Sequence, residues 1–211
     1  AVIGGGAAGL ACACGLANSG ARVTLIEAGA HLGGRASSFV DTGTGLEMDH
    51  CQHVILGCCA ESISFLSMIG SLEMVQFSDT IEMVSDTLGR VRVRAAALPA
   101  PFHLAPSLMT ADGLTRGEKL RLLRSLALMS MRKPDADASA AAYLKSLGFP
   151  ERVIPHFIDP ILESALNQRS DSASADYAKM VIAKALLETR RGYTLGVAGA
   201  PLSRVLAEPA S

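Results

Sequence analysis

A glycine-rich turn near the amino terminus constrains the fold of this chain more than any other feature. Gly4, Gly6 and Gly9 stand in the spacing G-x-G-x-x-G. A short apolar run, residues 1–3, precedes them, and a run of small residues suited to a helix follows over 7–19. This order predicts a strand, a tight turn and a helix. Gly4 permits the turn, Gly6 lets a phosphate group approach the backbone, and Gly9 lets the helix pack against the strand.

An acidic residue follows at the end of a second predicted strand. Gly20 ends the predicted helix, residues 22–28 ("RVTLIEA") form the strand, and Glu27 stands eighteen residues after Gly9. A carboxylate there accepts hydrogen bonds from the ribose hydroxyls of an adenine dinucleotide and disfavours the 2′-phosphate of NADP. The amino terminus of the helix offers free amides to the phosphates. These features predict an α/β Rossmann-like domain. The residues predicted to hold the dinucleotide in this region are Gly4, Gly6, Ala7, Ala8, Gly9, Glu27 and Ala28.

A second glycine pair distinguishes the chain from the plain NAD-binding pattern. It stands in "GGRASS", residues 33–38, shortly after Glu27. Here the chain resembles the flavin-containing amine oxidase and phytoene desaturase superfamily, whose pattern continues as Gly-Gly-Arg after the acid. The resemblance implies that the cofactor is FAD and that Gly33, Gly34 and Arg35 lie along its pyrophosphate. It also implies an FAD-binding domain with an inserted, largely helical substrate domain.

The segment 48–59, "MDHCQHVILGCC", resembles the hydroxysqualene dehydroxylase branch of that superfamily, which has Asp-Asn-Gly-Gln-His-Val here. His50 and Cys51 depart from the pattern of that branch. The resemblance implies that Gln52 and His53 lie near the flavin. Removal of a hydroxyl group requires that the departing oxygen be protonated or otherwise stabilised, which makes His53 a candidate acid. The alternative is that His53 only contacts the flavin or supports the structure.

Composition and charge exclude several other classes. The net charge of −1 and the absence of Trp argue against a nucleic-acid partner. Five cysteines in no disulfide-like spacing predict a reducing, cytoplasmic compartment. Histidines and cysteines within 50–59 fit no known zinc pattern, so no metal is expected. The chain opens inside a strand without Met, which predicts an amino-terminal fragment of a longer protein.

The sequence predicts three regions. Residues 1–97, with hairpins predicted at 36–49 and 80–94, form the amino-terminal part of the FAD-binding domain. Three prolines within 98–107 mark a boundary, and residues 98–190 form a mainly helical substrate or cap domain. Residues 191–211 begin a return segment.

A basic amphipathic helix is predicted over 118–133. Its spacing places one set of residues on a basic side and another on an apolar side. The basic side comprises Arg121, Arg124, Ser125, Leu128 and Arg132, and the apolar side comprises Leu120, Leu122, Leu123, Leu126, Ala127 and Met129. Such a helix either rests peripherally on an anionic membrane or presents a solvated face above a core.

The resemblance implies an FAD-dependent oxidoreductase acting on an apolar isoprenoid substrate. Its branch implies reductive dehydroxylation of hydroxysqualene to squalene, for hopanoid-type synthesis. Stretches 160–181 and 195–210 also resemble that branch. A carotenoid-type desaturase or an amine oxidase is the alternative enzyme. A dinucleotide-binding module without chemistry, or an inactive truncated fragment, is the alternative of another class.

Overall fold

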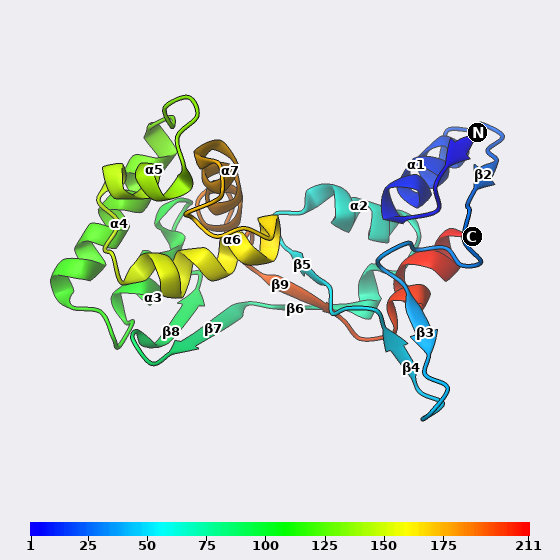
Figure 1. Ribbon diagram of the computed structural model, residues 1–211, viewed down its shortest axis with the longest axis horizontal. Helices are drawn as coiled ribbons and strands as arrows, with labels where there is room; N and C mark the ends of the chain where they lie inside the picture. The colour runs from blue at the N-terminus through cyan, green and yellow to red at the C-terminus, as the bar shows by residue number, and fades with distance from the viewer. The chain divides into compact units, whose positions relative to one another are not determined.

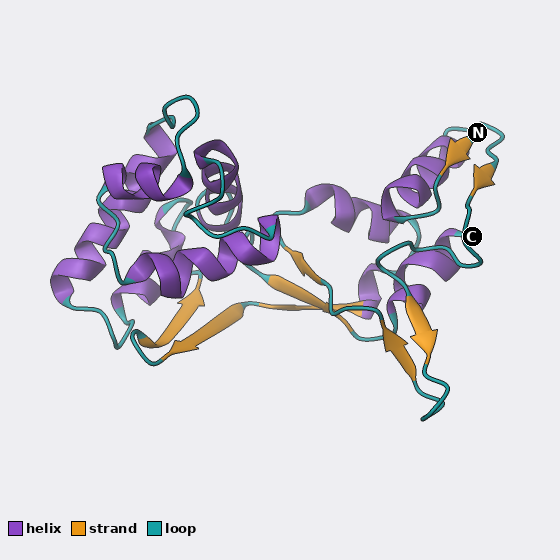
Figure 2. Ribbon diagram, in the orientation of Figure 1, coloured by secondary structure: helices purple, strands orange, loops and turns teal.

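The computed structural model describes residues 1–211 and divides them into two compact units. The first unit comprises residues 1–77 and 195–211, and the second comprises 78–194. The first mixes short strands with helices, whereas the second is a hairpin with a group of helices (Figures 1 and 2). The hairpin 80–94, which the sequence analysis grouped with the amino-terminal domain, lies in the second unit.

The first unit begins with the predicted strand, helix and strand. β1 (Val2–Ile3) pairs in parallel with β2 (Leu25–Ile26), and α1 (Ala7–Asn18) connects them. A right-handed connection through a helix is the usual way to place two consecutive strands in parallel. β2 is shorter than the predicted 22–28. Gly20 follows α1 with a φ of +86°, a conformation that favours glycine, and so ends the helix as predicted.

The next elements form a hairpin and a small sheet. In chain order they are β3 (Ser38–Val40), β4 (Glu47–Asp49), β5 (Val54–Leu56), α2 (Ala60–Met68), η1 (Leu72–Met74), β6 (Val75–Ser78) and β9 (Leu195–Ala198). β3 and β4 form the predicted hairpin. β9 lies between β5 and β6 in a three-stranded sheet. α2 and the carboxy-terminal turns pack against this sheet. The buried core between them consists of Leu66, Val75 and Val205.

The carboxy-terminal segment is bound to the β3–β4 hairpin. It comprises the helical turns η4 (Ser203–Ala207) and η5 (Glu208–Ala210). The Oδ1 atom of Asp49 accepts a hydrogen bond from the amide of Leu202 at 2.8 Å. Glu47 accepts a bond from the Ser203 hydroxyl at 2.8 Å and pairs with Arg204 at 2.8 Å. These polar contacts hold residues 202–204 against a segment more than 150 positions earlier in the chain.

The second unit is mainly helical, with one long hairpin. Its elements are β7 (Thr80–Ser85), β8 (Gly89–Arg94), η2 (Phe102–Leu104), α3 (Ala105–Met109), α4 (Arg116–Met131), α5 (Ala140–Leu147), η3 (Ile154–Ile158), α6 (Asp159–Leu166) and α7 (Ala175–Leu186). Side chains of α4, α5, α6 and α7 form its core, among them Met129, Leu144, Leu162 and Ile182, each fully buried. Gly148 ends α5 at a φ of +81°, a conformation that favours glycine.

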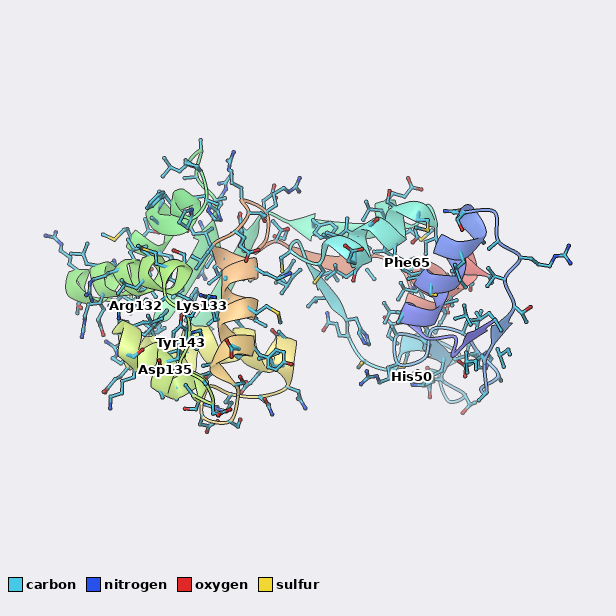
Figure 3. All side chains as sticks on the ribbon, turned by 90° about the horizontal axis from the view of Figure 1, so that it is seen from above. His50, Phe65, Arg132, Lys133, Asp135 and Tyr143 are labelled. Carbon is cyan, nitrogen blue, oxygen red and sulfur yellow. The ribbon has the colours of Figure 1, made fainter.

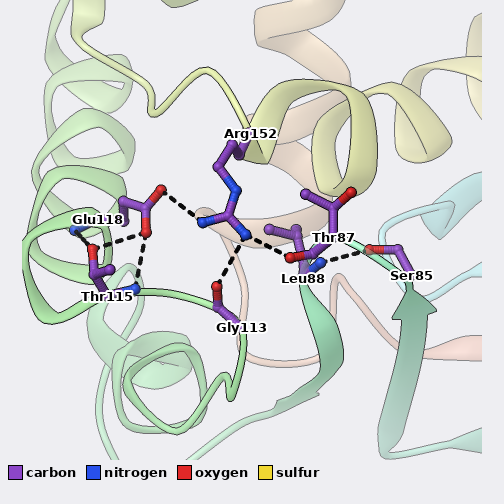
Figure 4. A network of polar contacts seen from close by, with 7 residues as sticks. All are labelled: Ser85, Thr87, Leu88, Gly113, Thr115, Glu118 and Arg152. Carbon is purple, nitrogen blue, oxygen red and sulfur yellow. Dashed lines mark hydrogen bonds and ion pairs between the residues drawn. The ribbon is translucent and has the colours of Figure 1, made fainter.

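A polar network fixes the start of α4 (Figure 4). The Thr115 hydroxyl accepts a bond from the Glu118 amide, and the Glu118 carboxylate accepts one from the Thr115 amide, which forms a capping box. Arg152 contacts the other carboxylate oxygen of Glu118 at 3.5 Å and donates to the carbonyl of Thr87 at 2.6 Å. Arg152 therefore connects the start of α4 to the turn of the β7–β8 hairpin.

The orientation of α4 differs from the predicted one at three positions, one of which is Ala127, predicted on the apolar side but exposed. Ser125, predicted on the basic side, is fully buried and donates to the carbonyl of Leu147 at 2.9 Å. Leu120, predicted on the apolar side, is 61% exposed. α5 packs against α4 and provides an acceptor for the hydroxyl, so the buried stripe is centred on Leu122, Ser125 and Met129.

The carboxy-terminal end of α4 is held by two neighbouring helices (Figure 3). The Tyr143 hydroxyl of α5 donates to the carbonyl of Arg132 at 2.8 Å, and the Lys179 ammonium of α7 donates to the same oxygen at 2.7 Å. A cation and a donor at this position satisfy a carbonyl that α4 leaves without a partner. The side chain of Arg132 remains exposed.

Candidate functional site

The glycine turn has the geometry of a phosphate-binding loop. Gly4 has a φ of +97°, which favours glycine, and a methyl group on Gly9 would overlap the carbonyl oxygen of Gly4. A Cβ atom at Gly6, by contrast, would meet nothing within 4 Å. No side chain caps α1 and its first turn has no acidic residue, so its amides face open space with the positive end of the helix dipole.

Glu27 lies beside this turn, at the end of β2. Its carboxylate accepts hydrogen bonds from the Gly5 amide at 2.5 Å and from the Gly29 amide at 2.7 Å. The bond from Gly29, followed by the one from Gly5, lowers the pKa of Glu27 below its ordinary value. The group is therefore ionised at neutral pH. Each oxygen retains lone pairs that can accept further bonds, because Glu27 is only partly buried.

The second glycine pair packs directly against the first. The Gly33 amide donates to the carbonyl of Gly5 at 2.8 Å, and Gly33 forms an isolated parallel bridge with Gly6. A Cβ atom on Gly34 would lie 3.2 Å from the α-carbon of Gly6. The adjacent Arg35 side chain is exposed and has neither an ion pair nor a hydrogen bond. The structure thus brings the turn, Glu27 and the pair 33–34 together on one surface.

A largely apolar cavity of about 440 Å³ begins at the first turn of α1. Ala7 and Ala8 line one part of it, while Ala36, His53 and Phe65 (labelled in Figure 3) line others. Few polar atoms reach this cavity, so an apolar group can occupy it with little desolvation cost. It extends from the open amides of α1 to the imidazole of His53.

The imidazole of His53 is oriented by the backbone. Its Nδ1 lies 3.0 Å from the carbonyl oxygen of Cys51, which can only accept, so Nδ1 carries the proton and Nε2 is left as the exchangeable position. The neighbouring His50 stacks on Phe39 of β3 with ring centroids 4.9 Å apart. Gln52 and Ala28 are exposed and do not line the cavity. Their predicted contacts with the cofactor stay predictions.

Gly5 is a residue that the sequence analysis did not single out. Its amide binds Glu27 and its carbonyl binds Gly33, so it connects the three parts of the surface. A Cβ atom at Gly5 would press on Leu32 and on the Glu27 side chain. The middle glycine of "GGG" was the available signal, since the G-x-G-x-x-G pattern does not require one at that position.

No group of three or more His, Cys, Asp or Glu side chains is arranged to hold a metal ion. None of the helices combines the length and the apolar character that crossing a bilayer requires. The predictions of no metal and of a cytoplasmic location stay predictions.

Comparison with known proteins agrees with this geometry. Residues 2–65 match the NAD(P)-binding Rossmann-like domain family. A hydroxysqualene dehydroxylase of Rhodopseudomonas palustris is 28% identical over 215 residues, covering 99% of this chain and 49% of that protein. A zeta-carotene desaturase of Synechocystis is 28% identical over 123 residues, covering 57% of this chain and 25% of that protein. The solved structure of putrescine oxidase superposes with a TM-score of 0.59 at 18% identity, covering 98% of this chain and 49% of that one.

The fold and the site define a Rossmann-like dinucleotide-binding domain. Beyond that domain, the chain is similar in sequence to hydroxysqualene dehydroxylases and carotene desaturases, and in fold to putrescine oxidase. These similar proteins are FAD-dependent, which agrees with the predicted flavin. The chain spans about half the length of the hydroxysqualene dehydroxylase it matches from end to end.

Proposed function

We propose that this protein is an FAD-dependent oxidoreductase that reductively removes the hydroxyl group of hydroxysqualene to give squalene, for hopanoid-type synthesis. The assignment of FAD rests on one surface of the structure. It is formed by Gly6, which has open space beside its backbone, by the ionised Glu27 and by the glycine pair 33–34. The similarity to hydroxysqualene dehydroxylase over 99% of the chain supports the substrate. The apolar cavity beside that surface suits an isoprenoid chain or a flavin ring.

The residues of this surface fit an adenine dinucleotide. The Glu27 carboxylate would accept bonds from the ribose hydroxyls, and the amides of Ala7 and Ala8 would donate to the pyrophosphate. The free guanidinium of Arg35 would add a charge-assisted contact to the same group. When bound, FAD would supply hydride transfer.

His53 would hold and deliver a proton at Nε2. Its Nδ1–H would donate to the Cys51 carbonyl, which orients the ring, and Nε2, 3.6 Å from the Cys51 sulfur, would carry the second proton. A protonated Nε2 would donate to the departing oxygen of the substrate, while the alanine and phenylalanine side chains of the cavity exclude water.

The experiment measures turnover under anaerobic conditions, with chemically reduced FAD and with oxidised FAD, of hydroxysqualene, phytoene and an amine offered separately. ADP binding is measured in parallel. Squalene formation from hydroxysqualene, with oxidation of the flavin, is the expected result. Turnover of phytoene alone, with oxidised flavin, would favour a carotenoid-type desaturase. Turnover of an amine alone would favour an amine oxidase. ADP binding without turnover of any of these substrates would favour a binding module or an inactive fragment.

The variant His53→Gln, with FAD bound, should lose turnover of hydroxysqualene, and an unchanged rate would exclude the acid role.

We also propose peripheral contact of α4 with an anionic membrane, from which an apolar substrate would be taken. Arg121 and Arg124 are exposed and form no ion pair within 4.0 Å, although Arg121 interacts electrostatically with Glu118. Leu120 and Met131 are 61% and 81% exposed on the same helix. Exposed cations beside exposed apolar side chains favour the surface of an anionic bilayer.

Liposome flotation tests this contact. Reversal of Arg121 and Arg124 to Glu should abolish co-flotation with phosphatidylserine vesicles. The control reverses Lys145 and Lys184, which are exposed on α5 and α7 and change the net charge equally. Equal flotation of the two double variants would contradict the proposal.

A further inference from the structure

A second cavity, of about 460 Å³, lies within the unit 78–194. It is formed by the open ends of the β7–β8 hairpin and by the segment that follows α7. Its lining includes Asp79, Arg94, Arg190, Arg191, Tyr193 and Thr194. Its volume is within the range of small-molecule sites, about 300–1,000 Å³. Nothing in the proposed flavin chemistry uses these residues.

The backbone around this cavity is fixed by internal hydrogen bonds. The buried Tyr193 hydroxyl donates to the carbonyl of Asp79 at 2.7 Å and accepts a bond from the Ala95 amide at 2.9 Å. One phenol thus connects both ends of the hairpin to the loop. The Arg190 guanidinium donates to the carbonyl of Ala96 at 3.1 Å. The segments that carry the arginines are therefore ordered before any ligand arrives, which lowers the entropy cost of binding.

The positive charges of the cavity are only partly balanced. On the same face of β8, Arg92 is ion-paired with Glu82 at 2.6 Å, whereas Arg94 has no acidic partner. Arg191 lies 3.6 Å from Asp79, with both side chains more than 70% exposed. An exposed pair of this kind contributes little stability and exchanges easily for a stronger acceptor. Three guanidinium groups face one carboxylate, so the lining carries an excess of positive charge.

We propose that this cavity binds a small oxyanion, the phosphate or diphosphate group of a ligand. Guanidinium groups stay protonated at all physiological pH values and donate paired N–H bonds that match phosphate oxygens. Arg94 offers all its N–H groups, and Arg190 offers those that do not bind Ala96. Diphosphate carries more negative charge than a carboxylate in a compact group, so it balances this lining better. The site is independent of the glycine turn, whose residues lie in the other unit.

Calorimetric titration with inorganic pyrophosphate and with inorganic phosphate, at constant ionic strength set with chloride, tests the proposal. FAD is present in excess, so that pyrophosphate cannot occupy the glycine turn. The variants are Arg94→Gln and Arg190→Gln. The control is Arg92→Gln, which removes the same charge from the same strand but at a residue that does not line the cavity.

We expect pyrophosphate to bind more tightly than phosphate, and each cavity variant to weaken it at least about tenfold, the worth of one charge-assisted hydrogen bond. The control should weaken binding much less than either cavity variant, since Arg92 is paired with Glu82 and does not line the cavity. Three results would overturn the proposal. They are no binding of pyrophosphate by the parent, unchanged binding by both cavity variants, or an equal loss in Arg92→Gln.

Discussion

Replacement of Gly6 by alanine separates folding from dinucleotide binding. Gly6 has an extended conformation, φ −73° and ψ 176°, which alanine adopts without strain, and its Cβ atom would meet nothing within 4 Å. Alanine is a poorer residue than glycine at the start of a helix, which costs about 0.5–1 kcal/mol. Alanine also lowers the conformational entropy of the unfolded chain, which stabilises the folded state by about 0.4–1 kcal/mol. The free energy of unfolding should therefore change by less than about 0.5 kcal/mol.

Binding should respond very differently to this change. The added methyl group occupies the space through which a diphosphate would reach the amides of α1. Loss of a single hydrogen bond to a charged acceptor costs about 1.5–3 kcal/mol, which is about 10- to 150-fold in the dissociation constant. Calorimetry with ADP and thermal denaturation of the same samples measure both quantities. Unchanged ADP affinity in Gly6→Ala would refute the assignment of this turn.

Two further glycines serve as controls on the same helix. Gly15 lies inside α1 with open space at its Cβ position, so Gly15→Ala should stabilise the protein by about 0.5–1 kcal/mol and leave ADP binding intact. Gly9→Ala should lower both stability and affinity, because its methyl group overlaps the Gly4 carbonyl. The turn would not be tightly packed if Gly9→Ala behaved like Gly15→Ala.

Three other residues give predictions that independent measurements check. Burial and the nearby Arg190 lower the pKa of His103 below 6.5. Because the unfolded chain then takes up a proton that the folded chain excludes, the free energy of unfolding should fall as pH drops below about 6.5. The variant His103→Phe should flatten this pH dependence in urea melts, and an unchanged slope would contradict the prediction. Backbone amides lower the pKa of Glu27, so the stability that its ionised carboxylate contributes is present above pH 4.5 and is lost as pH falls. A carbon-detected NMR titration of Glu27 should give a midpoint below pH 4.5. A midpoint at or above pH 4.5 would contradict the geometry. Arg152→Gln should reduce the free energy of unfolding by about 1 kcal/mol, since it removes the charged donor to the Thr87 carbonyl, and an unchanged urea midpoint would show that this contact is not stabilising.

Local patterns predicted the elements that depend on neighbouring residues. The glycine turn, the helix 7–18 and both hairpins follow from glycine spacing, small residues and alternation, whose physical basis lies within a few positions of the chain. The class of the site was predictable for the same reason, because Glu27 stands at a fixed distance from the turn.

Contacts between distant segments were not predictable in this way. The pairing of β5 with β9 joins residues 54–56 to 195–197, and no local pattern specifies that partner. The burial of Ser125 depends on an acceptor, the Leu147 carbonyl, on another helix. The packing of Gly33 against Gly5 likewise depends on a loop whose path the sequence alone does not determine.

The central claim is that the Glu27 carboxylate holds the ribose of a dinucleotide beside the glycine turn. The most direct measurement compares the affinity of ADP with that of 2′,3′-dideoxy-ADP, which lacks the ribose hydroxyls, in the parent protein and in Glu27→Gln. We predict that the parent prefers ADP at least about tenfold and that the variant loses this preference while still binding the diphosphate. Equal affinity of the parent for the two nucleotides, or an undiminished preference in Glu27→Gln, would contradict the claim.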